Sequence, residues 1–169
     1  MTGMISSEQA KWSEVQGSGQ LISPLSTYPV FIKAKSAIAE EKSKKGVFRI
    51  RRILPEAKDP VTVAAVDLLT LEKIFGKVNK CFMKRHDEHL IISVLFEEGT
   101  IMHADYTFGR PFHFELEWSG QEKIITFNSD VNRAFSNENG ILEACTSVKS
   151  DQHPGFTVHE VNQMVELMS

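Results

Sequence analysis

The second half of the chain is a series of short apolar stretches separated by turns, and this pattern restricts the fold more than any other feature. Leu90–Phe96 is apolar apart from Ser93, Ile101–Phe108 alternates, and Phe112–Trp118 places four large apolar side chains on one face. Ile124–Phe127 follows after another turn. Alternation with a period of two is typical of a strand with one buried face, and short turns join antiparallel neighbours. The pattern therefore predicts an antiparallel meander.

Two helices are also predicted. Asp59 can cap the first, Pro60 lies in its first turn, where a missing N–H costs nothing, and Gly76 can end it. The residues between carry a wide apolar face, which favours a mostly buried helix lying across a sheet. Thr157 and Glu160 have the spacing of a capping box at the start of a closing helix. Together these signals predict an α+β fold: a twisted antiparallel sheet packed by a central buried helix and a C-terminal helix.

The N-terminal region differs in composition from the rest. Residues 1–28 are rich in glycine and serine and predict a flexible arm, followed by one α+β domain over residues 29–169. The arm has few apolar anchors, among them Trp12, Leu21 and Ile22. A tryptophan in so polar a segment needs a groove elsewhere to leave water. We therefore expect these three residues to mediate self-association.

Charge is divided unevenly, with a balance of +8 over residues 33–85 and −10 over residues 86–169. In the basic half, residues 32–38 and 48–51 alternate small or apolar residues with lysine or arginine. If the two segments pair, they form a hairpin with a basic face suited to phosphates or anionic lipid. The predicted binding residues are Lys33, Lys35, Lys42, Lys44, Lys45, Arg49, Arg51 and Arg52. The alternative is a merely solvated sheet face.

The same division of charge bears on partners. The acidic half of one copy can meet the basic half of another, which favours head-to-tail association. Aromatic side chains that could stack on bases are missing from the predicted basic face, so nucleic-acid binding there would not be sequence-specific.

Two groups of polar residues carry ligand or acid–base chemistry. His86 and His89 are three residues apart, a spacing that converges on a helix but diverges on a strand, and a solvated turn is the favoured interpretation. His103 and Asp105 share one face of a predicted strand, and His113 can neighbour them on the next strand. Alternation on the polar face of a sheet explains this second group equally well. We predict no catalytic residue and no metal site.

Other function classes find no support in the sequence. Gly17 and Gly19 neither follow a strand nor open a helix, so no dinucleotide loop is predicted and no cofactor is expected. Cys81 and Cys145 have no metal-like spacing and are expected to be reduced thiols. No secretion signal or membrane-spanning stretch is recognisable, which predicts an intracellular protein.

The order of elements resembles that of rhabdovirus matrix proteins. The resemblance is carried by Val63–Val66 in the helix, by Arg110-Pro111-Phe112 opening a strand, by the turn at Gly120 and by Ile124–Phe127. It covers residues 29–130. The arm lacks the Pro-Pro-x-Tyr motif and the lysine cluster of animal-virus members, and the pI of about 6.1 is acidic. These departures fit a plant-infecting or otherwise divergent member.

The resemblance implies a structural, non-enzymatic viral matrix protein. Such a protein self-associates, coats the inner face of the host membrane and condenses a nucleoprotein–RNA complex, and is found in the virion and the host cytoplasm. The alternative, from another class, is a small-ligand-binding domain or enzyme. It would use a pocket in the sheet near His103, Asp105 and His113.

Overall fold

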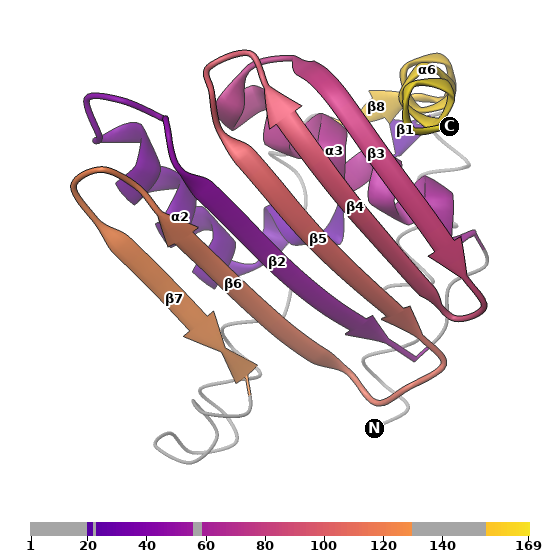
Figure 1. Cartoon of the computed structure of the whole chain (residues 1–169). Coiled ribbons are helices and arrows are strands. Elements are labelled where there is room, and N and C mark those ends of the chain that lie inside the picture. The colour runs from indigo at the N-terminus through magenta and orange to yellow at the C-terminus, as the bar shows by residue number, and fades with distance from the viewer. Residues whose placement is uncertain (1–19, 22, 56–58, 130–154) are drawn as a thin grey trace.

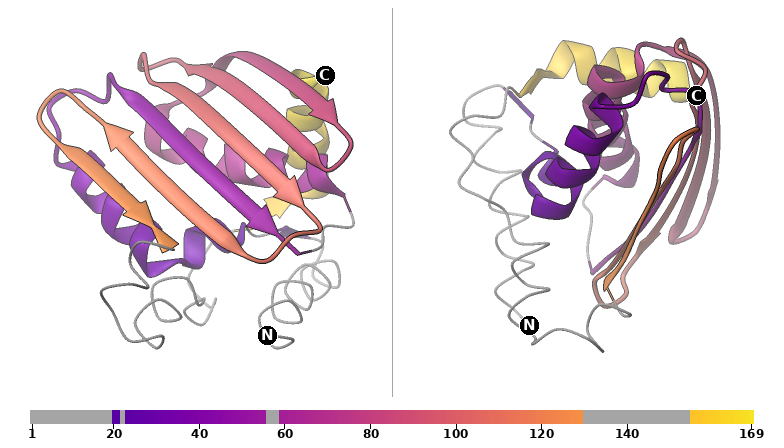
Figure 2. Two further views of the ribbon diagram at one scale, coloured as in Figure 1. Left: turned by 60° about the horizontal axis from the view of Figure 1, so that its bottom comes forward. Right: turned by 90° about the vertical axis from the view of Figure 1, so that its left-hand side faces the viewer.

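The computed structural model describes residues 20–21, 23–55, 59–129 and 155–169. These residues form a six-stranded mixed sheet with three α-helices on one side, and the other side of the sheet carries no helix (Figures 1 and 2). The predicted α+β class is confirmed, with a twisted sheet, a buried central helix and a C-terminal helix. In chain order, the described elements are β1 (Gln20–Leu21), η1 (Pro24–Thr27), α2 (Pro29–Ala39), β2 (Val47–Leu54), α3 (Pro60–Phe75), β3 (Val78–His86), β4 (His89–Phe96), β5 (Ile101–Phe108), β6 (His113–Ser119), β7 (Ile124–Asn128), β8 (Phe156–Thr157) and α6 (Val158–Met168).

The six strands lie in the order β3-β4-β5-β2-β6-β7. β2 comes first of these six in the chain, yet it lies in the interior of the sheet. β2 runs parallel to β5 and antiparallel to β6, and the other neighbours are antiparallel. The predicted neighbours β4–β5 and β6–β7 do pair, but β5 and β6 do not, because β2 lies between them. No local pattern indicates this insertion, since Val47 pairs with the distant residues Ile101 and Ser119.

Residues 29–39 form helix α2, and the strand predicted over residues 32–38 is therefore wrong. Phe31, Ala34 and Ile38 are its buried residues, and their spacing of three and four positions is that of one helix face. Alanine and lysine also favour a helix. Over so short a segment, a period of two and a helical period were both compatible with the sequence.

The basic hairpin consequently does not form. Lys33 and Lys35 are exposed on α2, which lies behind the sheet, whereas Arg49 and Arg51 belong to β2 within it (Figure 1). Lys42, Lys44 and Lys45 lie in the connection between α2 and β2, and Lys44 Nζ lies 3.6 Å from a Glu98 carboxylate oxygen. The predicted cations are therefore spread over separate surfaces.

The predicted central helix is confirmed as α3. The Asp59 carboxylate accepts hydrogen bonds from the first backbone N–H groups, and Gly76, with φ of 79°, follows the last turn. Phe75 lies at the centre of the core, with its ring centroid 5.4 Å from those of Phe48 and Trp118. The helix is buried along most of its length because it packs against both the sheet and α6 (Figure 2).

A buried ion pair joins α3 to the sheet. The Asp67 carboxylate accepts hydrogen bonds from Arg52 Nη1 at 2.6 Å, Tyr106 Oη at 2.9 Å and Ser23 Oγ at 2.5 Å. Arg52 Nη2 also donates to Tyr28 Oη at 3.3 Å. The side chains of Arg52 and Asp67 are 1% and 0% exposed. The prediction that Arg52 belongs to an exposed basic face is therefore wrong.

The C-terminal helix is tied to the N-terminal part of the chain. β1 pairs with β8, which leads directly into α6, and Leu21 of the predicted self-association set is buried in this chain's own core. The predicted capping box is present, because the Thr157 hydroxyl accepts from Glu160 N–H and the Glu160 carboxylate accepts from Thr157 N–H.

The capping box makes the start of α6 sensitive to pH. The hydrogen bonds from Thr157, assisted by Lys73 and Lys77, hold the pKa of Glu160 below its ordinary value of 4.5. A carboxyl with a lowered pKa stabilises the fold above its unfolded pKa, and loses this effect as pH falls through the folded pKa. Glu160→Gln should therefore reduce the free energy of unfolding at about pH 7 and have little effect at about pH 3. Urea unfolding at both pH values tests this, with Glu166→Gln as the control on the same helix.

Some predictions lie outside the described residues. They are the roles of Trp12 and Ile22 in self-association and the state of the Cys145 thiol. Cys81 is a half-buried free thiol, and burial raises its pKa. No helix in the described part of the chain is both long and apolar enough to cross a membrane.

Candidate functional site on the open face of the sheet

The side of the six-stranded sheet opposite the helices is here called the open face (Figure 2). Along the inner strands, buried residues alternate with more exposed ones that lie on this face. At its centre, Arg49 and Arg51 of β2 lie directly opposite Glu117 and Glu115 of β6. On the other side of β2, the same arginines pair in register with His103 and Asp105 of β5. We call the resulting group the central polar array. It consists of Arg49, Arg51, His103, Asp105, Glu115 and Glu117.

The array surrounds a shallow depression of about 540 Å³. Its floor lies over the middle of β5, β2 and β6, and its rim extends to Ile91 on β4 and to Thr126 and Asn128 on β7. The depression arises because outward side chains from five neighbouring strands surround it. Eight of its lining residues are polar, among them the whole central polar array, and five are apolar, of which Ile91 is the one on the open face. The polar side chains offer both hydrogen-bond donors and acceptors to a molecule that enters the depression.

The two arginines of the array are already paired. Arg49 Nη1 forms an ion pair with Glu117, and Arg51 Nη1 lies 3.8 Å from Glu115 Oε1. All four side chains are about one-third to one-half exposed, so these pairs contribute little to stability. Together with Asp105, the array contains two guanidinium groups and three carboxylates. It is therefore not the cationic surface that was predicted for anionic lipid or nucleic acid.

The second predicted group is only partly brought together. His103 and Asp105 line the depression, but His113 does not, because it lies at the start of β6, opposite Ile53 and beyond the Arg51–Glu115 pair. His113 instead lies beside Glu115, with 2.6 Å between Nε2 and Oε1, and its Nδ1 lies 3.1 Å from Ser129 Oγ. His113 thus holds a member of the array in position. The alternation of residues 113–117 indicated that Glu115 and Glu117 share this face, and sequence reasoning overlooked them.

His86 and His89 face each other rather than diverge. The two-residue turn Asp87-Glu88, with φ of 48° at Asp87, reverses the chain and makes the two histidines partners across the β3–β4 hairpin. His89 Nδ1 lies 3.1 Å from Thr107 Oγ1, and His86 Nδ1 lies 3.3 Å from Asp87. Within the described residues, no three metal-ligating side chains are grouped closely enough to hold a metal ion.

Comparison with known sequences gives no assignment. No protein-family model matches this chain, and no curated protein matches it at a significant level.

Comparison with solved structures identifies the fold. A dehydrogenase from Thermus thermophilus, WlbA (WbpB), solved with NAD and UDP-GlcNAcA, is similar over 94% of this chain and 57% of its own, with TM-score 0.53 and 11% identity. GenD2 from gentamicin A biosynthesis, solved with NAD, is similar over 85% of this chain and 52% of its own, with TM-score 0.53 and 13% identity. A probable dehydrogenase from Thermotoga maritima gives TM-score 0.50 and 15% identity, over 82% of this chain and 49% of its own.

These neighbours overturn the expected function. They are dehydrogenases, and the predicted role as a non-enzymatic viral matrix protein that coats membranes and condenses a nucleocapsid is therefore wrong. The resemblance was misleading because it rested on short motifs in one helix and a few strands. Many unrelated α+β folds contain such motifs. This chain spans about half the length of the dehydrogenases that it matches, and its fold is similar to that half.

Proposed function

We propose that this chain is the substrate-side part of an oxidoreductase-type enzyme, and that the central polar array binds a small hydroxylated molecule. The depression in the open face is the observation that carries the proposal. Its support from outside the chain is the similarity to about half of several dehydrogenases, one of which was solved with a sugar nucleotide. This site develops the alternative predicted from His103 and Asp105. It adds Arg49, Arg51, Glu115 and Glu117 to them.

The chemistry of the array favours hydroxyl groups over phosphates. A phosphate needs cations that are not already neutralised, whereas Arg49 and Arg51 each have a carboxylate partner. A hydroxyl group both donates and accepts hydrogen bonds, so it can bridge a guanidinium and a neighbouring carboxylate. Asp105 and His103 provide a further acceptor and a further ring nitrogen on the opposite wall. A ring or chain with adjacent hydroxyls satisfies this alternating pattern.

The described residues do not fit NAD. A dinucleotide places its pyrophosphate at the open N-terminus of a helix that follows a glycine-rich loop. Here the first N–H groups of α3 are occupied by the Asp59 carboxylate, and those of α6 by Thr157 with Glu160 close by. A second negative charge at either of these two helix ends would be repelled. The N-terminus of α2 has no side-chain cap, but residues 20–28, which precede it, contain no glycine. We therefore assign no nucleotide to these residues, and a nucleotide-binding unit would have to be supplied separately.

Isothermal titration of the full chain with D-glucose, N-acetyl-D-glucosamine and inorganic phosphate tests the proposal. We expect one of the sugars to bind and phosphate not to bind. Asp105→Asn should weaken sugar binding by about tenfold, equivalent to about 1.4 kcal/mol. Lys84→Gln, on the same face but outside the depression, is the matched control and should bind as the parent does. Tight phosphate binding without sugar binding, or equal sugar binding by Asp105→Asn, would contradict the proposal.

A further inference from the structure

We propose that the outer edge of β3 binds an extended acidic segment of a partner protein, which adds to the six-stranded sheet as a further antiparallel strand. No residue of β3 lines the depression, so the inference goes beyond the function proposed above and does not depend on it. It rests on the backbone groups of β3 that point out of the sheet, on the cations of this strand and on its exposed aromatic ring.

β3 is one of the two outer strands of the sheet, and among the described strands it pairs only with β4 (Figure 1). His86 and His89 flank the two-residue turn of this hairpin and are paired. Residues in this position exchange hydrogen bonds, and bonded and non-bonded pairs then alternate along the two strands. The N–H and C=O groups of Cys81, Met83 and Arg85 therefore point away from β4, toward a side of β3 where no described strand lies.

The cations of β3 have no acidic partner among the described residues. Lys80, Lys84 and Arg85 are exposed, none of them forms an ion pair with a described residue, and β3 itself contains no acid. Arg49 and Arg51 in the middle of the sheet, in contrast, are each paired with a glutamate. Lysines on an edge strand oppose its pairing with another basic strand. The same charges attract an acidic strand, so the edge selects its partner by charge.

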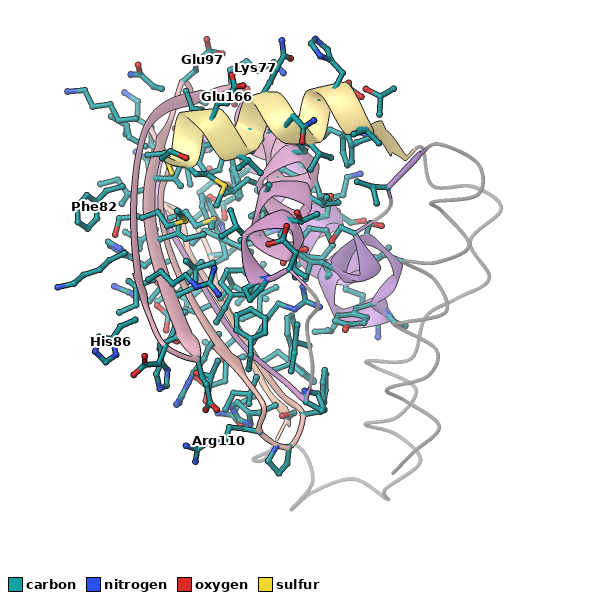
Figure 3. All side chains as sticks on the ribbon, turned by 90° about the vertical axis from the view of Figure 1, so that its right-hand side faces the viewer. Lys77, Phe82, His86, Glu97, Arg110 and Glu166 are labelled. Carbon is teal, nitrogen blue, oxygen red and sulfur yellow. The ribbon has the colours of Figure 1, made fainter. Side chains whose placement is uncertain are left out.

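An aromatic side chain lies between the two lysines. Phe82 is 65% exposed and points away from the helices, as does His86 further along the strand (Figure 3). Side chains alternate across a strand, so Lys80 and Lys84 lie on the same face as Phe82. A strand added beside β3 brings every second side chain next to these three residues. The segment that fits therefore carries an acid, an apolar residue and an acid at alternate positions.

The opposite edge of the sheet lacks this combination. β7 has five residues and no charged side chain, whereas β3 has nine residues. When a segment adds to a sheet edge, main-chain hydrogen bonds supply affinity and alternate side chains supply specificity. The edge of β3 therefore offers the longer row of backbone partners, together with a charge pattern that distinguishes one kind of segment from others.

Fluorescence anisotropy with a labelled peptide tests the inference. The probe is fluorescein-Glu-Thr-Glu-Val-Ile-Val-Glu-Thr-Glu-amide, whose isoleucine can lie beside Phe82 while the nearest glutamates lie beside Lys80 and Lys84. We expect saturable binding to the full chain that weakens as salt is added, because exposed charges are screened. The same peptide with lysine in place of every glutamate should not bind. Equal binding of the two peptides, or no binding of the acidic one, would overturn the inference.

Charge reversal locates the binding edge. Lys80→Glu combined with Lys84→Glu should weaken binding of the acidic peptide at least about tenfold, because like charges then face each other. The matched control is Lys33→Glu combined with Lys35→Glu, which changes the net charge equally on exposed positions of α2 and should bind as the parent does. Circular dichroism of both variants checks that they are folded. Equal weakening by the two pairs would contradict binding at β3.

Methylation of the peptide backbone separates strand addition from charge attraction alone. Residues directly opposite each other in an antiparallel pair exchange hydrogen bonds, so the two valines of the probe are the residues that bond to the outward groups of β3. N-methylation of both valines should abolish binding at unchanged charge, and N-methylation of the two glutamates next to them should leave it intact. Binding of both methylated peptides would contradict strand addition, and loss with the methylated glutamates alone would contradict the antiparallel orientation.

The sugar titration is read independently of these measurements. A chain that binds sugar but not the acidic peptide refutes only the partner edge. A chain that binds the peptide but no sugar refutes only the ligand site.

Discussion

Asp67→Ala is expected to lower the free energy of unfolding by about 3–5 kcal/mol, the range for breaking a buried ion pair by removing one partner. The substitution leaves the Arg52 guanidinium charged in the core, where its side chain is 1% exposed. It also removes the acceptor of the Tyr106 and Ser23 hydroxyls. Burial and the nearby carboxylate raise the pKa of Tyr106 well above its usual value, so its phenol stays a neutral donor. Urea unfolding followed by circular dichroism measures the loss.

A double substitution separates the cost of an orphaned charge from the value of the pair. Arg52→Met with Asp67→Asn removes both charges, changes the volume little and keeps an acceptor for the Tyr106 and Ser23 hydroxyls. Its free energy of unfolding should lie within about 2 kcal/mol of that of the parent. If Asp67→Ala alone costs less than about 1 kcal/mol, Arg52 must reach water in the folded chain, and the buried network described above is wrong.

Trp118→Ala is the second large effect and should cost about 3–5 kcal/mol. The Trp118 ring is fully buried and stacks on Phe75, with centroids 5.4 Å apart. Its indole N–H donates to Glu41 Oε1 at 2.7 Å. Glu41 itself is 6% exposed, and its other oxygen has no hydrogen-bond partner among the described groups. Removing the indole therefore creates a cavity and leaves a poorly solvated carboxylate.

Trp118→Phe isolates the hydrogen bond from the packing. It keeps an aromatic ring against Phe75 but removes the only donor seen at Glu41 among the described residues, and should cost about 1–3 kcal/mol. Gly120→Ala is a matched test of the same site, because a Cβ there would clash with the Glu41 carboxylate. Thermal unfolding of the three variants should rank Trp118→Ala as the least stable. Equal stability of Trp118→Phe and the parent would mean that Glu41 is hydrated.

What the sequence predicted correctly is what short-range chemistry determines. The cap at Asp59, the apolar helix after it and the Thr157–Glu160 box all depend on residues within four positions of one another. The buried ion pair was missed although the sequence carried a signal for it. Alternation from Phe48 onward places Arg52 on the inner face, and Asp67 interrupts an apolar helix. Two opposite charges, each at a position predicted to be buried, indicate a pair.

The site could be predicted only in part. His103 and Asp105 were found because they are two apart on one strand, and they do share the depression. Arg49 was assigned to a basic face because its partner Glu117 lies 68 residues away, and no local pattern indicates that β2 inserts beside β6. Because one strand was misplaced, the surface was predicted to be a cationic ribbon, whereas it is a neutralised array. The function expected from that surface was wrong for the same reason.

The interior position of β2 has a consequence for how the chain folds as it is made. β2 is synthesised before either of its neighbours, and its last pairings, with β6, require the chain to reach Ser119. At a synthesis rate of roughly 5–20 residues per second, the two edges of β2 and its apolar residues stay without partners for several seconds. Contacts so distant in sequence also slow folding in general. The nascent protein is therefore most vulnerable to misassociation through β2, and a chaperone that shields an extended segment would act on residues 47–54.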